Sequence, residues 1–308
     1  QGGGAMSKLA FPALVVVRKA LRPFNLDVAR IGATAAWLDR DDVTDPLTYL
    51  YFSEMRRTPL VSVRVSDARL GATGFTFGHD AGNPFTIAFA RAAAAPDPTA
   101  ARISVRAVLA DYYESVRPRA ALDVLSLRPD EAPGLANVDA AHFLLPWGSE
   151  SVEERAWRLR LWAFAGSLAN RRKIVLPKHG MTDFGPVSER KLALEVQRVL
   201  VLDESLKANG FRPSARHPLE VVGLRRGGDY RWLAMRGRHR FAACAAWAID
   251  SVDARVTKVI RREDVCTWPR VVSGAFTQQG ALRVFDRLFR GQPPACGLAW
   301  ARRTGDAR

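Results

Sequence analysis

The stretch from Leu219 to Val256 constrains the fold of this chain more than any other segment. Leu219–Leu224 is a mostly apolar run typical of a β-strand. Arg225–Asp229 contains two adjacent glycines and is typical of a hairpin turn. Tyr230–Met235 has the composition of a second strand. The sequence therefore predicts two antiparallel strands joined by a tight turn.

A helix and a third strand are predicted directly after this hairpin. Gly237 ends the second strand, and the alanine-rich run Phe241–Ala248 favours a helix. Asp250-Ser251 is expected to end that helix, and Val252–Val256 alternates like a strand. The predicted unit is strand, hairpin, strand, Gly-x-His-Arg, helix, strand.

The start of this helix has the features of an anion site. A strand that turns on Gly237 into a helix leaves several backbone N–H groups unpaired at the positive end of the helix dipole. His239 and Arg240 add two side chains that can bind phosphate oxygens in the same turn. A histidine beside an apolar helix is also often only packed and hydrogen-bonded, so a structural role is the alternative for His239.

This order of elements resembles the nucleotide-binding core of ParB-like proteins, sulfiredoxins and ADP-dependent free serine kinases. Upstream, Leu200–Gly210 matches the lead into the first core strand of that group, a helix with Ser-Leu and then Asn-Gly. The likeness covers roughly Phe184–Ile260, about a quarter of the chain. It implies a nucleotide site formed by Ser205, Lys207, Gly237, Arg238, His239 and Arg240.

Departures from the pattern narrow the resemblance. Sulfiredoxins carry their reactive cysteine between the glycine and the histidine, where this chain has Arg238. Partition-type ParB proteins continue into a long helical DNA-binding domain, but only about fifty residues follow Asp253 here. The His-Arg pair is most similar to the kinase branch, which implies ATP or ADP as the cofactor, with CTP as an alternative, and Mg²⁺ bridging the phosphates.

Three carboxylates are candidates for a general base. The segment Pro177–Arg198 is a polar loop followed by a helix that Ser188 can cap. The free serine kinases carry a glutamate base in the corresponding region. Glu189 is the first choice, and Asp183 and Glu195 are the others. Compensation of the helix dipole is the alternative role for Glu189, and an exposed helix face is the alternative for Glu195.

The chain has a net charge of +15, and the excess of basic residues lies in the half that carries the Gly-x-His-Arg motif. Residues 1–150 hold equal numbers of basic and acidic residues, so the whole excess falls in 151–308. Such a field attracts anions, although an arginine-rich composition is also typical of a GC-rich genome. Lys191, Arg198 and Lys207 lie near the expected site, where an exposed basic helix face is the simpler interpretation. Nucleic acid is the second choice of partner, because no recognised nucleic-acid module is present.

Composition and pattern predict an α/β (α+β) protein. Hydrophobic residues make up 48% and charged residues 25% of the chain, as in globular domains. Residues 1–6 have the composition of a purification-tag remnant. An N-terminal α+β domain is expected over 7–150, and a ParB/sulfiredoxin-like domain with a small mixed sheet and helices over 151–308.

Several further elements are expected outside the core unit. Thr58–Val65 predicts a strand, and Ala101–Val116 predicts a helix in which Tyr112 and Tyr113 are packing residues. Arg91–Ala101 is rich in alanine and proline and is expected to be a surface loop. The sequence also predicts a helix from Ser151 to about Asn170 with a Ser151/Glu154 capping box, and a packed helix over Ala281–Phe289.

The chain is expected to be cytoplasmic, with no membrane span. Its apolar run Leu14–Val17 is far too short to cross a bilayer. The three cysteines have no metal-ligand spacing and are expected to be reduced thiols. No dedicated metal site is predicted, and any magnesium would be held mainly by phosphates.

Together these observations predict a nucleotide-dependent phosphotransferase (kinase) or nucleotide hydrolase that acts on a small polar acceptor. Trp147, Tyr112-Tyr113 and Trp268–Gly274 are similar to motifs of ParB-like proteins from polysaccharide gene clusters, which suggests a sugar or glycan precursor as the acceptor. The alternative is a non-catalytic, nucleotide-switched module that contacts DNA or another polyanion through the basic half of the chain. A third alternative, a nuclease, lacks an acidic metal-binding cluster in the sequence.

Overall fold

The computed structural model describes residues 45–47, 50, 60–78, 82–169, 174–176, 178–212 and 218–305. The expected tag remnant at 1–6 and the apolar run at 14–17 lie outside these residues. The described helices are α3 (Pro84–Ala94), α4 (Pro98–Ser115), α5 (Ala121–Leu125), α6 (Val152–Ala169), α7 (Glu189–Asn209), α8 (Arg238–Ala246), α9 (Pro269–Val272), α10 (Gln278–Arg290) and α11 (Leu298–Gly305).

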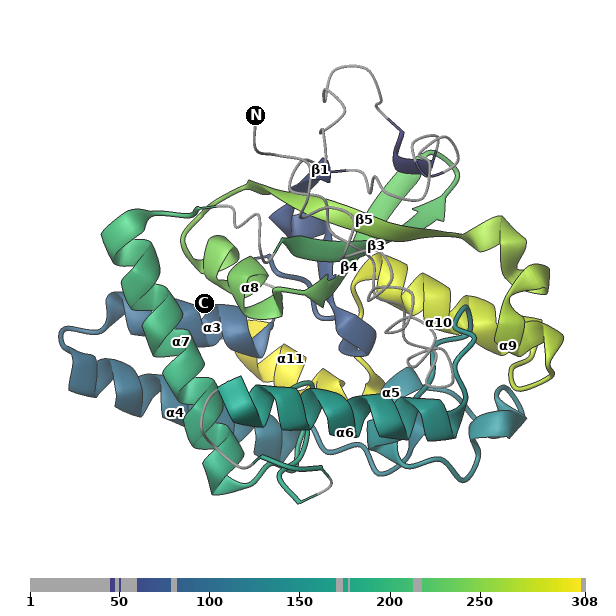
Figure 1. Cartoon of the computed structure of the whole chain (residues 1–308), viewed down its shortest axis with the longest axis horizontal. Helices are drawn as coiled ribbons and strands as arrows, with labels where there is room; N and C mark the ends of the chain where they lie inside the picture. The colour runs from purple at the N-terminus through teal and green to yellow at the C-terminus, as the bar shows by residue number, and fades with distance from the viewer. Residues whose placement is uncertain are drawn as a thin grey trace, which may run out of the picture.

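A five-stranded mixed sheet forms the centre of the molecule. Its strands are β1 (Leu60–Arg64), β2 (Ala68–Leu70), β3 (Leu219–Arg226), β4 (Asp229–Arg236) and β5 (Ser251–Arg261), in the spatial order β1-β5-β3-β4-β2. The β3–β4 and β1–β5 pairs are antiparallel, whereas β3–β5 and β2–β4 are parallel. Figure 1 shows β3, β4 and β5 across the upper part of the view, with most of the helices below them.

The predicted core unit is confirmed at the level of its elements. The hairpin, the helix after Gly237 and the following strand occur in the expected order, so the chain has the expected mixed α/β character. The turn is tighter than predicted, because both strands extend until only Gly227 and Gly228 lie between them. The third strand also runs further than Val256, to Arg261.

Helices α3, α4, α7 and α8 pack against one another below the sheet. Asn83 caps α3 by accepting hydrogen bonds from the backbone N–H groups of Phe85 and Thr86, and Asp97 caps α4 in the same way. The expectation of a loop over Arg91–Ala101 is therefore wrong for most of its length. Alanine favours a helix there, and the connection shrinks to the three residues between α3 and α4.

The sheet and the buried core contain residues from both sides of position 150. Strands β1 and β2 pair with β5 and β4, and the ring of Phe77 stacks on that of Phe241 at a centroid distance of 5.5 Å. The described residues of the ranges 7–150 and 151–308 thus share one sheet and one hydrophobic cluster. Within the described residues, no helix is long and apolar enough to cross a membrane.

Candidate functional site

The first half of α7 presents one polar face toward the centre of the molecule. Ser188 caps the helix by accepting from the backbone N–H of Lys191 at 3.2 Å, as predicted. Lys191, Leu194, Glu195 and Arg198 follow at spacings of three and four residues, so they share one side of the helix. This side faces the segment that precedes α7 and the start of α8.

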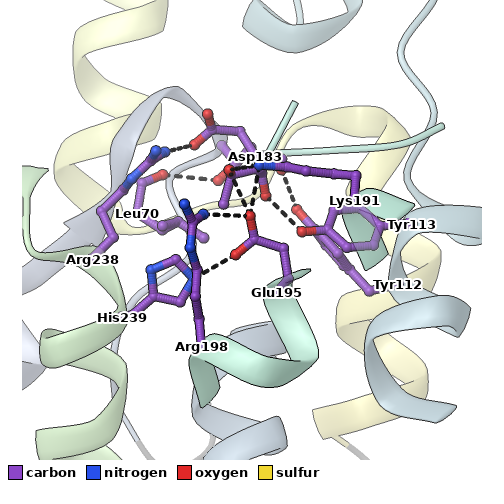
Figure 2. Close-up of polar contacts among 11 residues, drawn as sticks. Leu70, Tyr112, Tyr113, Asp183, Lys191, Glu195, Arg198, Arg238 and His239 are labelled. Carbon is purple, nitrogen blue, oxygen red and sulfur yellow. Dashed lines mark hydrogen bonds and ion pairs between the residues drawn. The ribbon is translucent and has the colours of Figure 1, made fainter. Parts of the chain in front are cut away.

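Glu195 is the centre of a buried polar cluster. Its side chain has no exposed surface, and one carboxylate oxygen, Oε1, lies 2.7 Å from Lys191 Nζ and 2.8 Å from Arg198. Thr182 donates to the same oxygen at 3.2 Å and accepts from Lys191 at 2.9 Å. The second oxygen, Oε2, lies 2.9 Å from Nε2 of His239. Figure 2 shows Lys191, Arg198 and His239 around the Glu195 carboxylate.

The cluster keeps Glu195 ionised. Burial alone would raise its pKa, but the hydrogen bond with His239 and the charges of Lys191, His239 and Arg198 outweigh burial and hold the pKa well below its usual range. A carboxylate with so low a proton affinity is a weak base. Its role is to fix the positions of the three side chains around it.

The loop that carries Thr182 and Asp183 is anchored on α4. The hydroxyl groups of Tyr112 and Tyr113 donate to the backbone carbonyls of Asp183 and Thr182, respectively. Both tyrosines are buried, as predicted, and burial raises the pKa of each phenol well above its usual value, so both stay protonated as donors. A Cβ atom at Gly185 would collide with the carbonyl oxygen of Tyr113, so only glycine allows this close approach.

A cavity of about 540 Å³ opens beside this cluster, within the usual range of roughly 300–1,000 Å³ for ligand sites. One side is formed by α7, the Thr182-Asp183 loop and Arg238, and the sheet contributes Val222 and Leu233–Met235. Residues 143–150 and the first turns of α6 form much of the remaining wall, together with Gly71, Ala72, Ile174, Leu176, Lys258 and Arg270. The described lining includes seven basic side chains: Arg155, Arg158, Lys191, Arg198, Arg238, Lys258 and Arg270.

Only two acidic side chains, Glu150 and Asp183, line the cavity among the described residues. Asp183 forms an ion pair with Arg238, and Glu150 pairs with Arg158 at 2.6 Å. The cavity thus has a large excess of positive charge. Like charges repel one another more strongly in a partly enclosed space than in water, so an anion bound there would relieve this repulsion.

The predicted phosphate-binding residues separate in the structure. Arg238 lines the cavity, whereas His239 is held by Glu195 and packs edge-on against the ring of Phe85 at a centroid distance of 4.7 Å. Arg240 donates to the backbone carbonyl of Pro218 at 3.3 Å, and neither it nor Gly237 is among the cavity residues. Gly237 has a φ of 84° and is the cap residue directly before α8, as expected from its position after β4.

The other predicted residues on α7 also have different environments. Ser205 and Lys207 are exposed near the far end of the helix, about 20 Å along its axis from Lys191. Lys207 pairs with Asp203 at 2.8 Å. Glu189 is exposed and pairs with Arg106 of α4, where Nη2 lies 2.9 Å from Oε2.

The simpler interpretations of α7 are wrong for two residues. Glu195 does not lie on an exposed helix face, and Lys191 is buried and does not belong to an exposed basic face. Compensation of the helix dipole by Glu189 and an exposed basic face at Lys207 remain apt interpretations, because both side chains are exposed to solvent. Of the three candidate bases, Asp183 alone lines the cavity.

Several cavity residues were not singled out from the sequence. Arg155 and Arg158 lie near the N-terminus of α6, where the helix dipole disfavours cations, and this unfavourable position was a detectable signal. Lys258 donates to the carbonyl of Trp147 at 3.2 Å, and Arg270 donates to those of Leu145 and Glu150. These last two cations fix the shape of the wall formed by residues 145–150.

No protein-family model, curated protein or solved structure matches this chain. Its relation to the ParB-like, sulfiredoxin and free serine kinase group therefore stays a prediction from the sequence. What the protein binds is inferred from the side chains of the cavity itself.

Proposed function

We propose that the protein binds a nucleoside di- or triphosphate in the cavity beside α7 and transfers or hydrolyses its terminal phosphate. The observation that carries this proposal is that the described lining of the cavity has seven basic and only two acidic side chains. A phosphate chain bears several negative charges and many acceptor oxygens, and guanidinium groups match them with paired hydrogen bonds. The apolar side chains of the same cavity offer contacts to a base and a sugar.

The phosphates are assigned to Lys191, Arg198 and Arg238. All three line the cavity, and Lys191 and Arg198 are oriented by their ion pairs with Glu195. Prior orientation lowers the entropy that these long side chains lose when a ligand binds. This assignment differs from the sequence-based one, because His239 supports the cluster through Glu195 and Arg240 points to Pro218.

Asp183 is assigned as the general base. It would accept the proton of an acceptor hydroxyl or of water while that oxygen forms a bond to the terminal phosphorus. The bond from phosphorus to the bridging oxygen breaks, and the nucleotide leaves with one phosphate fewer and takes the electron pair of that bond. Arg238, Lys191 and Arg198 would stabilise the charge that develops on the transferred phosphoryl group.

Magnesium fits this site only as an ion held largely by the nucleotide. Among the described residues, no group of three or more His, Cys, Asp or Glu side chains is placed to hold a metal ion. Asp183 offers the kind of oxygen ligand that Mg²⁺ accepts. When bound, the ion would supply positive charge that offsets the charge of the phosphates.

The same proposal includes membership of the ParB/sulfiredoxin-like superfamily and a cytoplasmic location. The order β3, β4, Gly237, α8 and β5 supports the first, and the free thiols of Cys244, Cys266 and Cys296 fit the second. A small polar acceptor such as a sugar or glycan precursor remains the proposed substrate. Binding without turnover would instead favour the nucleotide-switched module.

A ligand screen tests this proposal. Thermal unfolding is measured with adenosine, ADP, ATP and CTP, each with and without magnesium, because a ligand that binds the native state raises the unfolding temperature. We expect a rise with at least one di- or triphosphate and none with adenosine. No rise with any nucleotide at millimolar concentration would contradict the proposal. Phosphate release and transfer to sugars are then assayed with the nucleotide that binds.

A further inference from the structure

We propose that the end of the cavity beside α6 is a second anion site, centred on Arg155, that binds a phosphate or carboxylate group of the acceptor. The acceptor would then be a hydroxyl compound that carries its own negative charge, such as a sugar phosphate or a sugar acid. This inference rests on the proposed function, because it concerns the second substrate of the same cavity.

Arg155 is a mostly buried cation that has no close partner among the residues that the structure describes. Its side chain is 12% exposed, and its nearest carboxylate oxygen is Glu150 Oε1 at 3.8 Å. That oxygen is engaged more closely by Arg158, at 2.6 Å. Within the described part of the chain, the buried Nε of Arg155 has no hydrogen-bond partner. A buried donor without a partner is costly, and a bound anion would satisfy it.

The surroundings of Arg155 make its charge unfavourable without a ligand. Burial lowers its pKa, Glu150 acts in the opposite direction, and the neighbouring cation Arg158 lowers it further. The side chain also belongs to the first turn of α6, whose dipole is positive at that end. Its guanidinium lies over the ring of Phe143, 4.8 Å from the centroid, which holds it in place without neutralising it.

The other cations at this end of the cavity already have partners. Lys258 and Arg270 donate to backbone carbonyls of residues 145–150. These two side chains fix the shape of the cavity wall, so among the described cations at this end Arg155 is the one whose donors point to a missing ligand. Arg158 contributes charge beside it.

Arg155 and the proposed phosphate-binding residues Lys191, Arg198 and Arg238 line the same cavity. Asp183 and Arg238 are near enough to act on Arg155: the charge of Asp183 raises its pKa, and the charge of Arg238 lowers it. Apolar side chains line the space as well, among them Leu159, Met181 and Leu194. A short carbon chain or sugar ring could therefore lie against these side chains, with its anionic group on Arg155 and a hydroxyl directed toward Asp183.

The test compares Arg155→Met with Arg160→Met, a matched change at an exposed arginine of the same helix. Calorimetry measures binding of the nucleotide, and then of glucose 6-phosphate, glucuronate and glucose in the presence of a non-hydrolysable nucleotide. We expect the wild-type protein and Arg160→Met to bind at least one of the two anionic sugars and not glucose. Arg155→Met should keep its nucleotide affinity and lose at least about tenfold in affinity for that anionic sugar.

A second variant tests the proposal even if Arg155→Met fails to fold. Glu150→Gln removes the carboxylate that competes for Arg155 and Arg158, so affinity for the anionic sugar should increase, a gain that damage to the fold would not produce. Unchanged sugar binding by Arg155→Met, equal binding of glucose, or no sugar binding by the wild type would overturn the proposal. A loss of nucleotide affinity in Arg155→Met would assign Arg155 to the nucleotide and overturn it too. If the anionic sugar binds through Arg155 while no nucleotide binds, the proposed function fails and the second site stands.

Discussion

His239 Nε2 lies 2.9 Å from Glu195 Oε2, and this contact links the start of α8 to the middle of α7. Because an ionised carboxylate can only accept hydrogen bonds, His239 carries a proton on Nε2 and donates it. The histidine of the Gly-x-His-Arg motif therefore donates its hydrogen bond to a buried carboxylate. Its neighbour Arg238 lines the cavity.

Removing the His239 hydrogen-bond donor should mainly lower the stability of the fold, because His239 does not contact the ligand directly in this account. His239→Ala leaves one buried oxygen of Glu195 without a partner, at a cost of about 1–3 kcal/mol. His239→Gln keeps a donor and should recover part of the loss. Urea unfolding measures both variants. An alanine variant as stable as the wild type that no longer binds nucleotide would mean that His239 contacts the ligand directly.

Low pH should decrease the free energy of unfolding, because the pKa of Glu195 is lowered in the folded protein. Its pKa in the folded protein is held well below 4.5, so the ionised form contributes stability at neutral pH. This contribution is complete above the unfolded-state pKa and is lost as the pH falls through the lower folded-state value. Glu195→Gln should cost about 3–5 kcal/mol at pH 7, because it leaves Lys191 buried without its carboxylate.

The measurement is the free energy of unfolding of the wild type and Glu195→Gln from pH 7 down to pH 3. The difference between the two proteins should shrink as the pH falls below about 4.5, where Glu195 of the wild type begins to gain a proton on unfolding. A difference that is the same at every pH would show that the charge of Glu195 is not the source of the stability.

Turnover should depend on Asp183 and not on Glu189. Asp183→Asn removes the proposed base from the cavity wall and should lower kcat by about 10²–10⁴-fold, with the affinity for nucleotide retained. Glu189→Gln changes a carboxylate that is exposed and paired with Arg106, so its kcat should equal that of the wild type. Steady-state phosphate release or transfer compares the two. Equal rates for Asp183→Asn and the wild type would reject Asp183 as the base.

The loop that carries Asp183 should require glycine at position 185. Gly185→Ala drives a Cβ atom into the carbonyl oxygen of Tyr113, and we expect a loss of about 1–3 kcal/mol with reduced nucleotide binding. Gly228→Ala is the control, because a Cβ there meets no atom of the described residues within 4 Å. Thermal unfolding of both variants checks this. Equal stabilities would mean that the loop moves without cost.

Elements with local signals could be predicted from the sequence. The glycine pair at 227 and 228, Gly237 and the Ser188 cap each fix a local backbone geometry that neighbouring residues reveal. The strand Ala68–Leu70 gives no such signal, because three residues show no periodicity and its pairing with β4 is a long-range contact. Asn83-Pro84 was a usable sign of a helix start, since a cap residue followed by proline is typical of one.

The site was harder to predict because its geometry depends on packing between distant segments. Consecutive residues on a helix point about 100° apart, so the Gly-x-His-Arg pattern does not reveal which of Arg238, His239 and Arg240 faces a ligand. The packing of α7 against α8 places Arg238, and not its two neighbours, in the cavity wall. Burial of Glu195 depends on the same contact, and Arg155 reaches the cavity only because α6 lies against it.

The most direct measurement is nucleotide affinity by calorimetry in Arg238→Met and Arg240→Met, two matched changes two residues apart on α8. Arg238 lines the cavity and Arg240 contacts Pro218 on another side. Loss of a charge-assisted contact of about 1.5–3 kcal/mol should weaken binding at least tenfold in Arg238→Met, while Arg240→Met binds like the wild type. Equal loss in both variants, or loss only in Arg240→Met, would contradict a phosphate site in this cavity.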